Sequence, residues 1–169
     1  WAPFTVDSAR GLVYLPVGTP SNDWYGGERK GAGLFGETLL CLDARTGKRV
    51  WHFQTAHHGL WDYDLPAPPN LVTVNHDGKR VDVVVAPTKQ GFLFVFDRVS
   101  GKPLWPIEER PVPQSDVPGE ATSPTQPYPT KPAPFSKQGF SLDDVIDFTP
   151  DVKAAALAEI AGYRTGPLF

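Results

Sequence analysis

The sequence predicts an all-β fold. From the N-terminus to about Trp105, short runs rich in Val, Leu, Phe and Tyr alternate with turn residues, a pattern typical of short strands joined by hairpins. A ten-residue pattern occurs twice within this region, which indicates a repeated structural unit. The composition, with 40% apolar and 21% charged residues, is that of a globular protein.

Six strands are expected before Trp105, each bounded by turn residues. The pair Asp77-Gly78 lies between two apolar runs, and both residue types tolerate the positive φ that a tight hairpin requires. The expected strands are residues 11–17, 38–42, 48–54, 71–75, 81–86 and 91–96.

The repeat is the clearest architectural signal. Residues 42–51 and 96–105 share the pattern apolar-Asp-x-x-[Ser/Thr]-Gly-Lys-x-apolar-Trp, in strict register 54 residues apart. In each copy the Asp carboxylate can accept hydrogen bonds from turn amides, the Gly supplies a left-handed position, and the Trp begins the next strand with a large surface to bury. A unit of this size fits one four-stranded blade of a β-propeller.

Two copies cannot close a ring, so residues 1–105 are expected to hold about two to three blades of a larger propeller. The 169 residues contain no methionine, and we therefore expect a processed chain or a piece of a longer one. The single cysteine, Cys41, lies in an apolar run and is expected to be a small buried hydrophobic residue.

The character of the sequence changes after Trp105. Eight prolines fall between Pro111 and Pro134, and because proline fixes φ and lacks a backbone donor, residues 106–140 are expected to form a long extended loop. Interspersed aromatic residues favour a loop laid over the propeller surface, with a disordered linker as the alternative. Residues 141–169 are expected to be a short helical insertion, with a capping box at Ser141 and a second helix starting at Thr149-Pro150.

Charge and hydropathy exclude some partners. The net charge of −3 provides no basic surface for phosphate backbones, so neither nucleic acid nor an anionic membrane surface is an expected partner. The apolar runs are far shorter than the ~20 residues that a membrane-spanning helix needs.

The densest cluster of polar and aromatic residues is segment 57–69. Two carboxylates two residues apart, Asp62 and Asp64, can bind a hard cation through oxygen and leave one group to accept a proton. They share a face if the segment is a strand, but a loop is an equal alternative, as is a purely structural role in capped turns. The adjacent His57 and His58 lack the spacing of a zinc pair.

Several stretches carry a family resemblance. The chain resembles an internal piece of the dehydrogenases that use pyrroloquinoline quinone (PQQ), and within them it is most similar to the membrane-bound glucose dehydrogenase type. The repeat resembles that family's tryptophan-docking motif, in which the Trp of one blade packs on its neighbour. The matching stretches are Trp1-Ala2-Pro3, residues 11–18, 23–27, 57–67 and 86–91, and Ser123-Pro124-Thr125-Gln126-Pro127.

The resemblance implies an eight-bladed propeller that oxidises sugar or alcohol hydroxyls with PQQ and Ca²⁺ or Mg²⁺, a lanthanide not being excluded. It implies that Asp62 is the catalytic base and that Lys89, 27 residues later, is the cation beside the quinone oxygens, where it would stabilise developing charge. Asp62 and Lys89 would both contact the cofactor. Trp1 aligns with the wall of the cofactor stack, its alternative being a blade-core Trp.

The metal ligands implied by the resemblance are less well defined. Where alcohol-oxidising members place a Gly-Asn ligand, this chain reads Thr19-Pro20-Ser21-Asn22-Asp23, so Asp23 is the first candidate and Asn22 the second. Asp64 is a further metal candidate, although it does not discriminate between metals. Gly59 stands where the glucose type usually has Asp, which would loosen substrate contacts.

The resemblance also implies a quinone or cytochrome as electron acceptor and a periplasmic location, with any membrane attachment through regions outside these residues. The alternative function is a non-catalytic propeller of the same superfamily that serves as a protein-binding scaffold. As an isolated piece, the chain is expected to be inactive.

Overall fold

The first four strands form one antiparallel sheet in chain order. The computed structural model describes residues 2–169, and in it the order is β1-β2-β3-β4. Burial alternates along β2, from Leu12 through Tyr14, as the two-residue period of a strand requires. The strands are β1 (Thr5–Asp7), β2 (Leu12–Val17), β3 (Thr38–Asp43) and β4 (Arg49–Gln54).

The second sheet contains β5 (Asn70–His76), β6 (Lys79–Pro87) and β7 (Leu93–Asp97), again antiparallel and in chain order. His76 pairs with Lys79, so Asp77 and Gly78 form a two-residue loop with φ of 50° and 75°. This confirms the hairpin expected from the Asp-Gly pair. The six expected strands are confirmed to within two residues at either end, whereas β1 was not expected.

The two copies of the repeat form the same turn. Asp43 Oδ1 accepts hydrogen bonds from the amides of residues 45 and 46 and from the Thr46 hydroxyl. Asp97 Oδ1 accepts the equivalent bonds from residues 99 and 100 and from the Ser100 hydroxyl. Gly47 and Gly101 both have φ of 70°. Each turn is therefore one unit of side-chain and backbone bonding, as the repeat predicts.

The tryptophan of the first copy packs on the turn of the second. A Cβ added at Gly101 would lie 2.5 Å from the ring of Trp51, so a glycine is needed there. The Trp51 indole N–H donates to the carbonyl of Arg98 at 3.3 Å, and its ring lies 5.7 Å from that of Phe96. Together with Tyr14 and Cys41, these rings form the core between the two sheets, with Cys41 buried as expected.

Proline does not prevent strand pairing in segment 106–140. β8 (Ile107–Pro111) and β9 (Thr125–Pro129) form a two-stranded sheet, so the long extended loop expected for residues 106–140 contains a pair of strands that was not expected. The flanking bonds run from the Thr130 N–H to the carbonyl of residue 106 and from the Val112 N–H to that of residue 124. This parity places Pro127 and Pro129 at ladder positions where no donor is needed.

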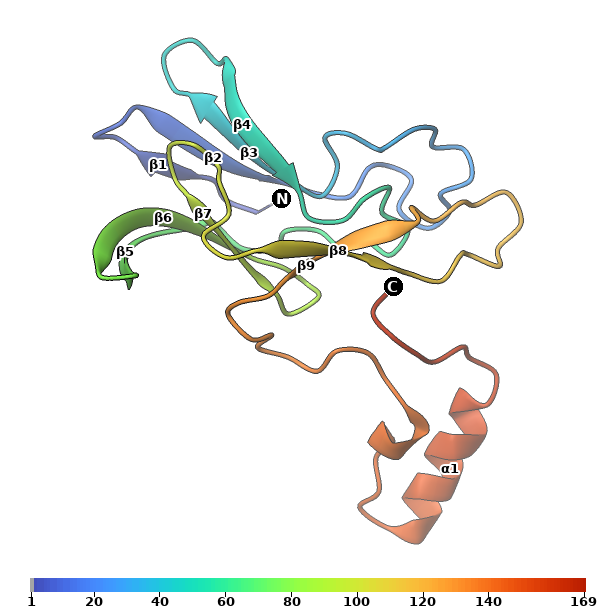
Figure 1. Ribbon diagram of the computed structural model, residues 1–169. Coiled ribbons are helices and arrows are strands. Elements are labelled where there is room, and N and C mark those ends of the chain that lie inside the picture. Colours follow the sequence, from blue (N-terminus) through green and yellow to red (C-terminus); the bar gives the residue numbers. More distant parts are fainter. Residues whose placement is uncertain (1) are drawn as a thin grey trace.

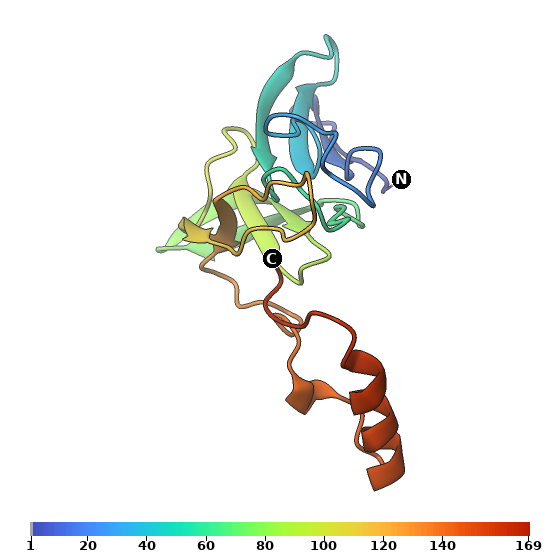
Figure 2. The same ribbon diagram turned by 90° about the vertical axis from the view of Figure 1, so that its right-hand side faces the viewer.

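The C-terminal part extends away from the sheets, as Figures 1 and 2 show. It contains a 3₁₀ turn η1 (Leu142–Asp144) and helix α1 (Pro150–Ile160). Ser141 donates its N–H and hydroxyl to Asp144, and the Thr149 hydroxyl accepts from Val152 N–H, which confirms both predicted helix starts. No helix in residues 2–169 has the length and apolar character to span a membrane.

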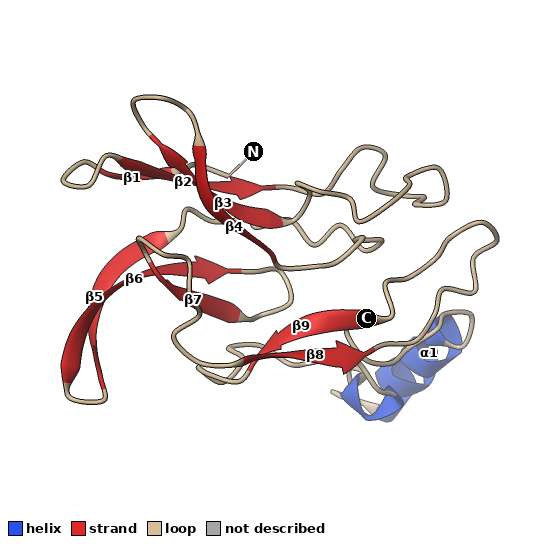
Figure 3. Ribbon diagram, turned by 45° about the horizontal axis from the view of Figure 1, so that its top comes forward, coloured by secondary structure: helices blue, strands red, loops and turns tan. Residues whose placement is uncertain are grey.

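Figure 3 shows the sheets of β1–β4, β5–β7 and β8–β9 as separate groups of red strands. Three loops leave the same end of the first two sheets: residues 18–37 follow β2, residues 55–69 follow β4, and residues 88–92 follow β6. The side chains of the candidate site come from these loops.

Candidate active site

Asp62 and Asp64 lie in the loop between β4 and β5, not in a strand. Asp62 has φ of 54°, in the left-handed region, which is uncommon for a residue with a side chain. The loop alternative left open by the sequence is therefore the correct one. Strained backbone of this kind is found where the surrounding structure fixes it, often at functional sites.

Lys89 joins the two aspartates. Its Nζ donates to Asp62 Oδ2 at 3.0 Å, to the Asp62 carbonyl at 3.0 Å and to Asp64 Oδ2 at 3.2 Å. Burial on its own would lower the pKa of Lys89, but the hydrogen bonds to Asp62 and Asp64 outweigh it and raise that pKa above its ordinary value. Lys89 therefore stays protonated, and the three residues that the sequence singled out converge.

The two carboxylates differ in exposure. The Asp62 side chain is 48% exposed and that of Asp64 is 11% exposed. Asp64 Oδ1 accepts the Thr19 N–H at 2.6 Å, and a Cβ added at Gly18 would lie 2.5 Å from the same oxygen. Asp64 is thus held by loop 18–37, whereas Asp62 faces open space.

Two residues near the aspartates were not predicted from the sequence. Thr19 binds Asp64 as described, and its hydroxyl donates to Glu37 Oε1 at 3.1 Å. Glu37 is buried, 1% exposed, and burial raises its pKa against the opposing hydrogen bonds from Thr19 and Tyr63. The only available sequence signal was an acidic residue directly before an apolar strand.

A pocket of about 760 Å³ opens beside the aspartates. Asp62, Asp64 and Asp23 all contribute to its lining, and its volume falls in the range of small-molecule sites. Asn22, the second metal candidate, accepts the N–H of Trp24 through Oδ1. Trp1 lies outside the described residues. Within residues 2–169, no three His, Cys, Asp or Glu side chains are grouped so as to hold a metal ion.

His57 anchors the loop to the β8–β9 sheet. The buried Gln126 accepts the His57 N–H at 2.7 Å and donates to the His57 carbonyl at 2.8 Å. The His57 ring lies 2.9 Å from Glu109 Oε1. Segment 106–140 therefore supports the loop that carries the aspartates, rather than running free as a disordered linker.

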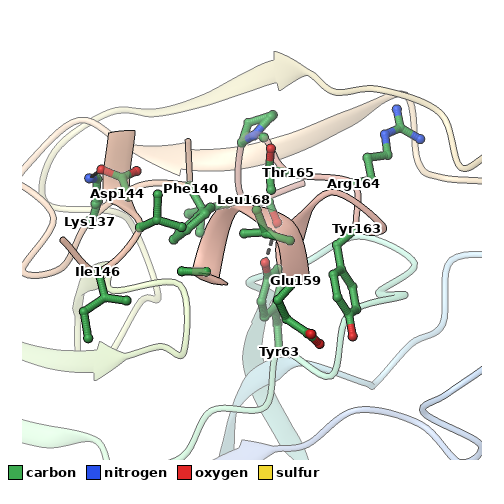
Figure 4. A pocket seen from close by; sticks show the side chains of 16 residues that line it. Tyr63, Lys137, Phe140, Asp144, Ile146, Glu159, Tyr163, Arg164, Thr165 and Leu168 are labelled. Atoms are coloured by element: carbon green, nitrogen blue, oxygen red, sulfur yellow. Dashed lines mark hydrogen bonds and ion pairs between the residues drawn. The ribbon is translucent and has the colours of Figure 1, made fainter. Parts of the chain in front are cut away.

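A second hollow, of about 810 Å³, lies between α1 and the C-terminal segment. Figure 4 shows Tyr63 on one wall of it, with its hydroxyl directed to the carbonyl of Leu168. Burial raises the pKa of Tyr63 to about 12, so the hydroxyl stays neutral and donates. This hollow and the aspartate pocket have no lining residue in common.

The whole chain, residues 1–169, matches the family model described as PQQ, "Glucose/ethanol/alcohol dehydrogenase, beta-propeller domain". The chain belongs to this PQQ β-propeller family. The resemblance seen in the sequence is confirmed, and so is the partial β-propeller fold.

Two curated relatives and one solved structure illustrate the match. The chain is 46% identical over 129 residues to "Probable quinate dehydrogenase (quinone)" of Xanthomonas campestris pv. juglandis, covering 75% of this chain and 16% of the relative. It is 44% identical over 129 residues to "Quinoprotein glucose dehydrogenase" of Escherichia coli (strain K12), covering 76% and 16%. The structure of quinohemoprotein alcohol dehydrogenase from Comamonas testosteroni matches with a TM-score of 0.59 and 30% identity, over 76% of this chain and 19% of that one.

This PQQ β-propeller chain thus spans about a sixth of the curated relatives it matches. Its residues fit the family's cofactor: two aspartates bound by a protonated Lys89 line a pocket of suitable volume, and an ammonium group beside them can bind quinone oxygens. The carboxylate oxygens of Asp62 and Asp64 are metal ligands of the type that hard cations prefer.

Proposed function

We propose that this chain forms the active-site sector of a quinoprotein dehydrogenase that oxidises a hydroxyl group of a sugar or alcohol. The observation that carries the proposal is the convergence of Lys89 on Asp62 and Asp64 beside an open pocket. The names of similar proteins, which include glucose, quinate and alcohol dehydrogenases, support this substrate class.

In this proposal Asp62 is the general base. Its side chain is half exposed, whereas Asp64 is held by both Lys89 and Thr19, so Asp62 is the carboxylate that a substrate hydroxyl can reach. It removes the hydroxyl proton as the carbinol C–H bond breaks. A positioned base of this kind contributes about 10²- to 10⁴-fold to the rate.

Lys89 has two roles in the proposal. Its ammonium group orients Asp62, because it donates to both the carboxylate and the backbone carbonyl of that residue. It also supplies fixed positive charge at the pocket, which stabilises negative charge on an oxygen bound there. The buried carboxylate of Asp64 accepts a further hydrogen bond from the ammonium group and so holds it in position.

PQQ, when bound, supplies a carbonyl that accepts hydride, and a cation such as Ca²⁺, Mg²⁺ or a lanthanide polarises it. Lys89 and Asp62 would contact the cofactor, and Trp1 would form one wall of its stack. Asp23 and Asp64 would contribute metal ligands; both line the same pocket, which supports the assignment.

We also propose a periplasmic location, on the basis of the resemblance to the membrane-bound glucose dehydrogenase type. Any membrane attachment would involve segments outside these residues. The proposed electron acceptor is a quinone or a cytochrome. A quinone is favoured by the name of the Xanthomonas relative, which includes that acceptor.

The test uses the full-length protein reconstituted with PQQ and either Ca²⁺, Mg²⁺ or La³⁺. Dye reduction is followed with glucose, other aldoses, quinate, glycerol and primary alcohols. We expect turnover with at least one of them and a change in quinone absorbance. Binding of PQQ with no turnover on any substrate would favour the scaffold alternative over an enzyme.

Asp62→Asn is expected to lower kcat about 10²- to 10⁴-fold while PQQ still binds, because the amide keeps the size of the carboxylate but is not a base. The matched control is Asp147→Asn, an exposed aspartate beyond the sheets, which should keep wild-type kcat. Full activity of Asp62→Asn would rule out its assignment as the base.

A further inference from the structure

Glu37 is a buried carboxyl group whose backbone is fixed by two loops. Its N–H donates to the carbonyl of Gly18 at 3.0 Å, and its own carbonyl accepts from the N–H and the hydroxyl of Thr55 at 2.7 and 2.8 Å. Its φ of 47° is in the left-handed region. These bonds determine the direction in which the side chain leaves the backbone, which is into the interior beside the aspartate pair.

The side chain of Glu37 is connected to the aspartate segment through two residues, Tyr63 and Thr19. Oε1 accepts the Tyr63 N–H at 3.2 Å, and Tyr63 stands between Asp62 and Asp64 in the chain. The same oxygen accepts the Thr19 hydroxyl at 3.1 Å, and the Thr19 N–H donates to Asp64 at 2.6 Å. One carboxyl oxygen therefore fixes the backbone between the aspartates and the threonine that holds Asp64.

The other oxygen explains a glycine. Among the described residues Glu37 Oε2 is buried without a hydrogen-bond partner, and a Cβ added at Gly59 would overlap the Glu37 carboxyl group. Gly59 does not have a positive φ, so its backbone conformation is open to any residue. The reason for a glycine at position 59 is therefore the space that the Glu37 carboxyl occupies.

We propose that Glu37 and Gly59 act as one unit that positions the segment from Asp62 to Asp64 for catalysis. Glu37 is the positioning residue, and Gly59 makes room for it. The inference rests on the proposed function, since the positioned groups are the proposed base and its neighbour. A side chain at residue 59 and the Glu37 carboxyl exclude each other, so the glycine leaves room for a carboxyl group from the residue directly before β3.

The test is a double-mutant cycle in the full-length, PQQ-reconstituted enzyme. Glu37→Ala removes both accepted hydrogen bonds, and Gly59→Ala displaces the carboxyl that accepts them; each is expected to lower kcat about 10- to 100-fold, the usual effect of losing a supporting residue. The effects should not add: Gly59→Ala in the Glu37→Ala background should cost no further activity, because the space is then free. Glu37→Gln should restore most of the activity, since its amide oxygen can accept both bonds.

Two controls match these variants. Glu28→Ala removes an exposed carboxylate, and Gly162→Ala adds a methyl group where nothing lies within 4 Å. Both should keep wild-type kcat and KM. For the Glu37 variants we expect the loss in kcat with a smaller change in KM, because neither bond accepted by the Glu37 side chain involves Asp23.

A second readout does not depend on turnover. Hydrogen exchange of the Tyr63 amide should accelerate in Glu37→Ala and Gly59→Ala but not in Glu37→Gln, because this amide loses its acceptor only in the first two. Unchanged exchange and kcat in Glu37→Ala, or additive effects of the two substitutions, would overturn the inference. Absence of turnover in the wild type would contradict the proposed function alone, since exchange would still test the positioning.

Discussion

Replacing Gly101 with Ala tests how the two blades pack against each other. The substitution places a residue with a Cβ at φ of 70°, which costs about 1–2 kcal/mol. It also places the methyl group 2.5 Å from the Trp51 ring. That ring cannot move away freely, because Tyr14 and Phe96 lie 6.0 and 5.7 Å from it, so overpacking adds about 1–3 kcal/mol.

Gly78→Ala is the matched control for this experiment. Gly78 has φ of 75°, and nothing lies within 4 Å of a Cβ built there. It should therefore show the backbone cost of about 1–2 kcal/mol alone. Gly101→Ala is expected to be more destabilising by the overpacking term, about 1–3 kcal/mol.

The assay is urea unfolding of the full-length protein, followed by tryptophan fluorescence. The variant Trp51→Leu/Gly101→Ala should be less destabilised than the sum of its single substitutions, since the smaller side chain leaves space for the methyl group. Equal destabilisation by Gly101→Ala and Gly78→Ala would refute the reasoning, because it would mean that the ring does not limit the space above residue 101.

Two further predictions concern the supports of the fold. Burial on its own would raise the pKa of Asp7, but hydrogen bonds from Arg98 and Arg10 outweigh it and lower that pKa below its ordinary value of 3.8. The ionised Asp7 therefore stabilises the fold fully above the ordinary value, and this stabilisation is lost as the pH falls below it. The difference in urea midpoint between wild type and Asp7→Asn should narrow between pH 5 and pH 3, and a constant difference would contradict this. Gln126→Leu leaves the His57 N–H and carbonyl without their partner and should cost about 2–4 kcal/mol in urea unfolding. Its control, the exposed Gln114→Leu, should cost little, and equal losses would show that the bonds to His57 do not matter.

The blades were predictable from the sequence because their signals are local. The Asp-Gly hairpin loop and the Asp-x-x-[Ser/Thr]-Gly turn each bond within a few residues, so the residue types alone indicate the structure. The β8–β9 pair was not predictable in this way. Proline density argues against strands in general, and only the pairing register reveals that Pro127 and Pro129 avoid the donor positions.

The candidate site likewise contains residues that the sequence predicts and residues that it does not. The resemblance singled out Asp62 and Lys89, and the structure brings them within 3.0 Å. The supporting roles of Thr19 and Glu37 depend on contacts between residues far apart in the sequence: Thr19 and Glu37 are 18 residues apart, and Glu37 and Tyr63 are 26 apart. Such contacts leave no periodic pattern, because each loop follows its own strand and the sheets alone bring the loops together.

The packing of Trp51 on Gly101 joins the two copies of the repeat head to tail: the tryptophan of the first copy fits against the turn glycine of the second. Within residues 2–169, the space above Gly47 is open, although its turn is the same as that of Gly101. At the other end Trp105 packs edge-on against His76, 5.5 Å away, rather than on a turn glycine. An interface of this head-to-tail kind is satisfied everywhere only when the row of blades closes on itself, and an open row can continue by adding another copy. Closure of a ring built from such contacts would leave no open end at which a filament could grow.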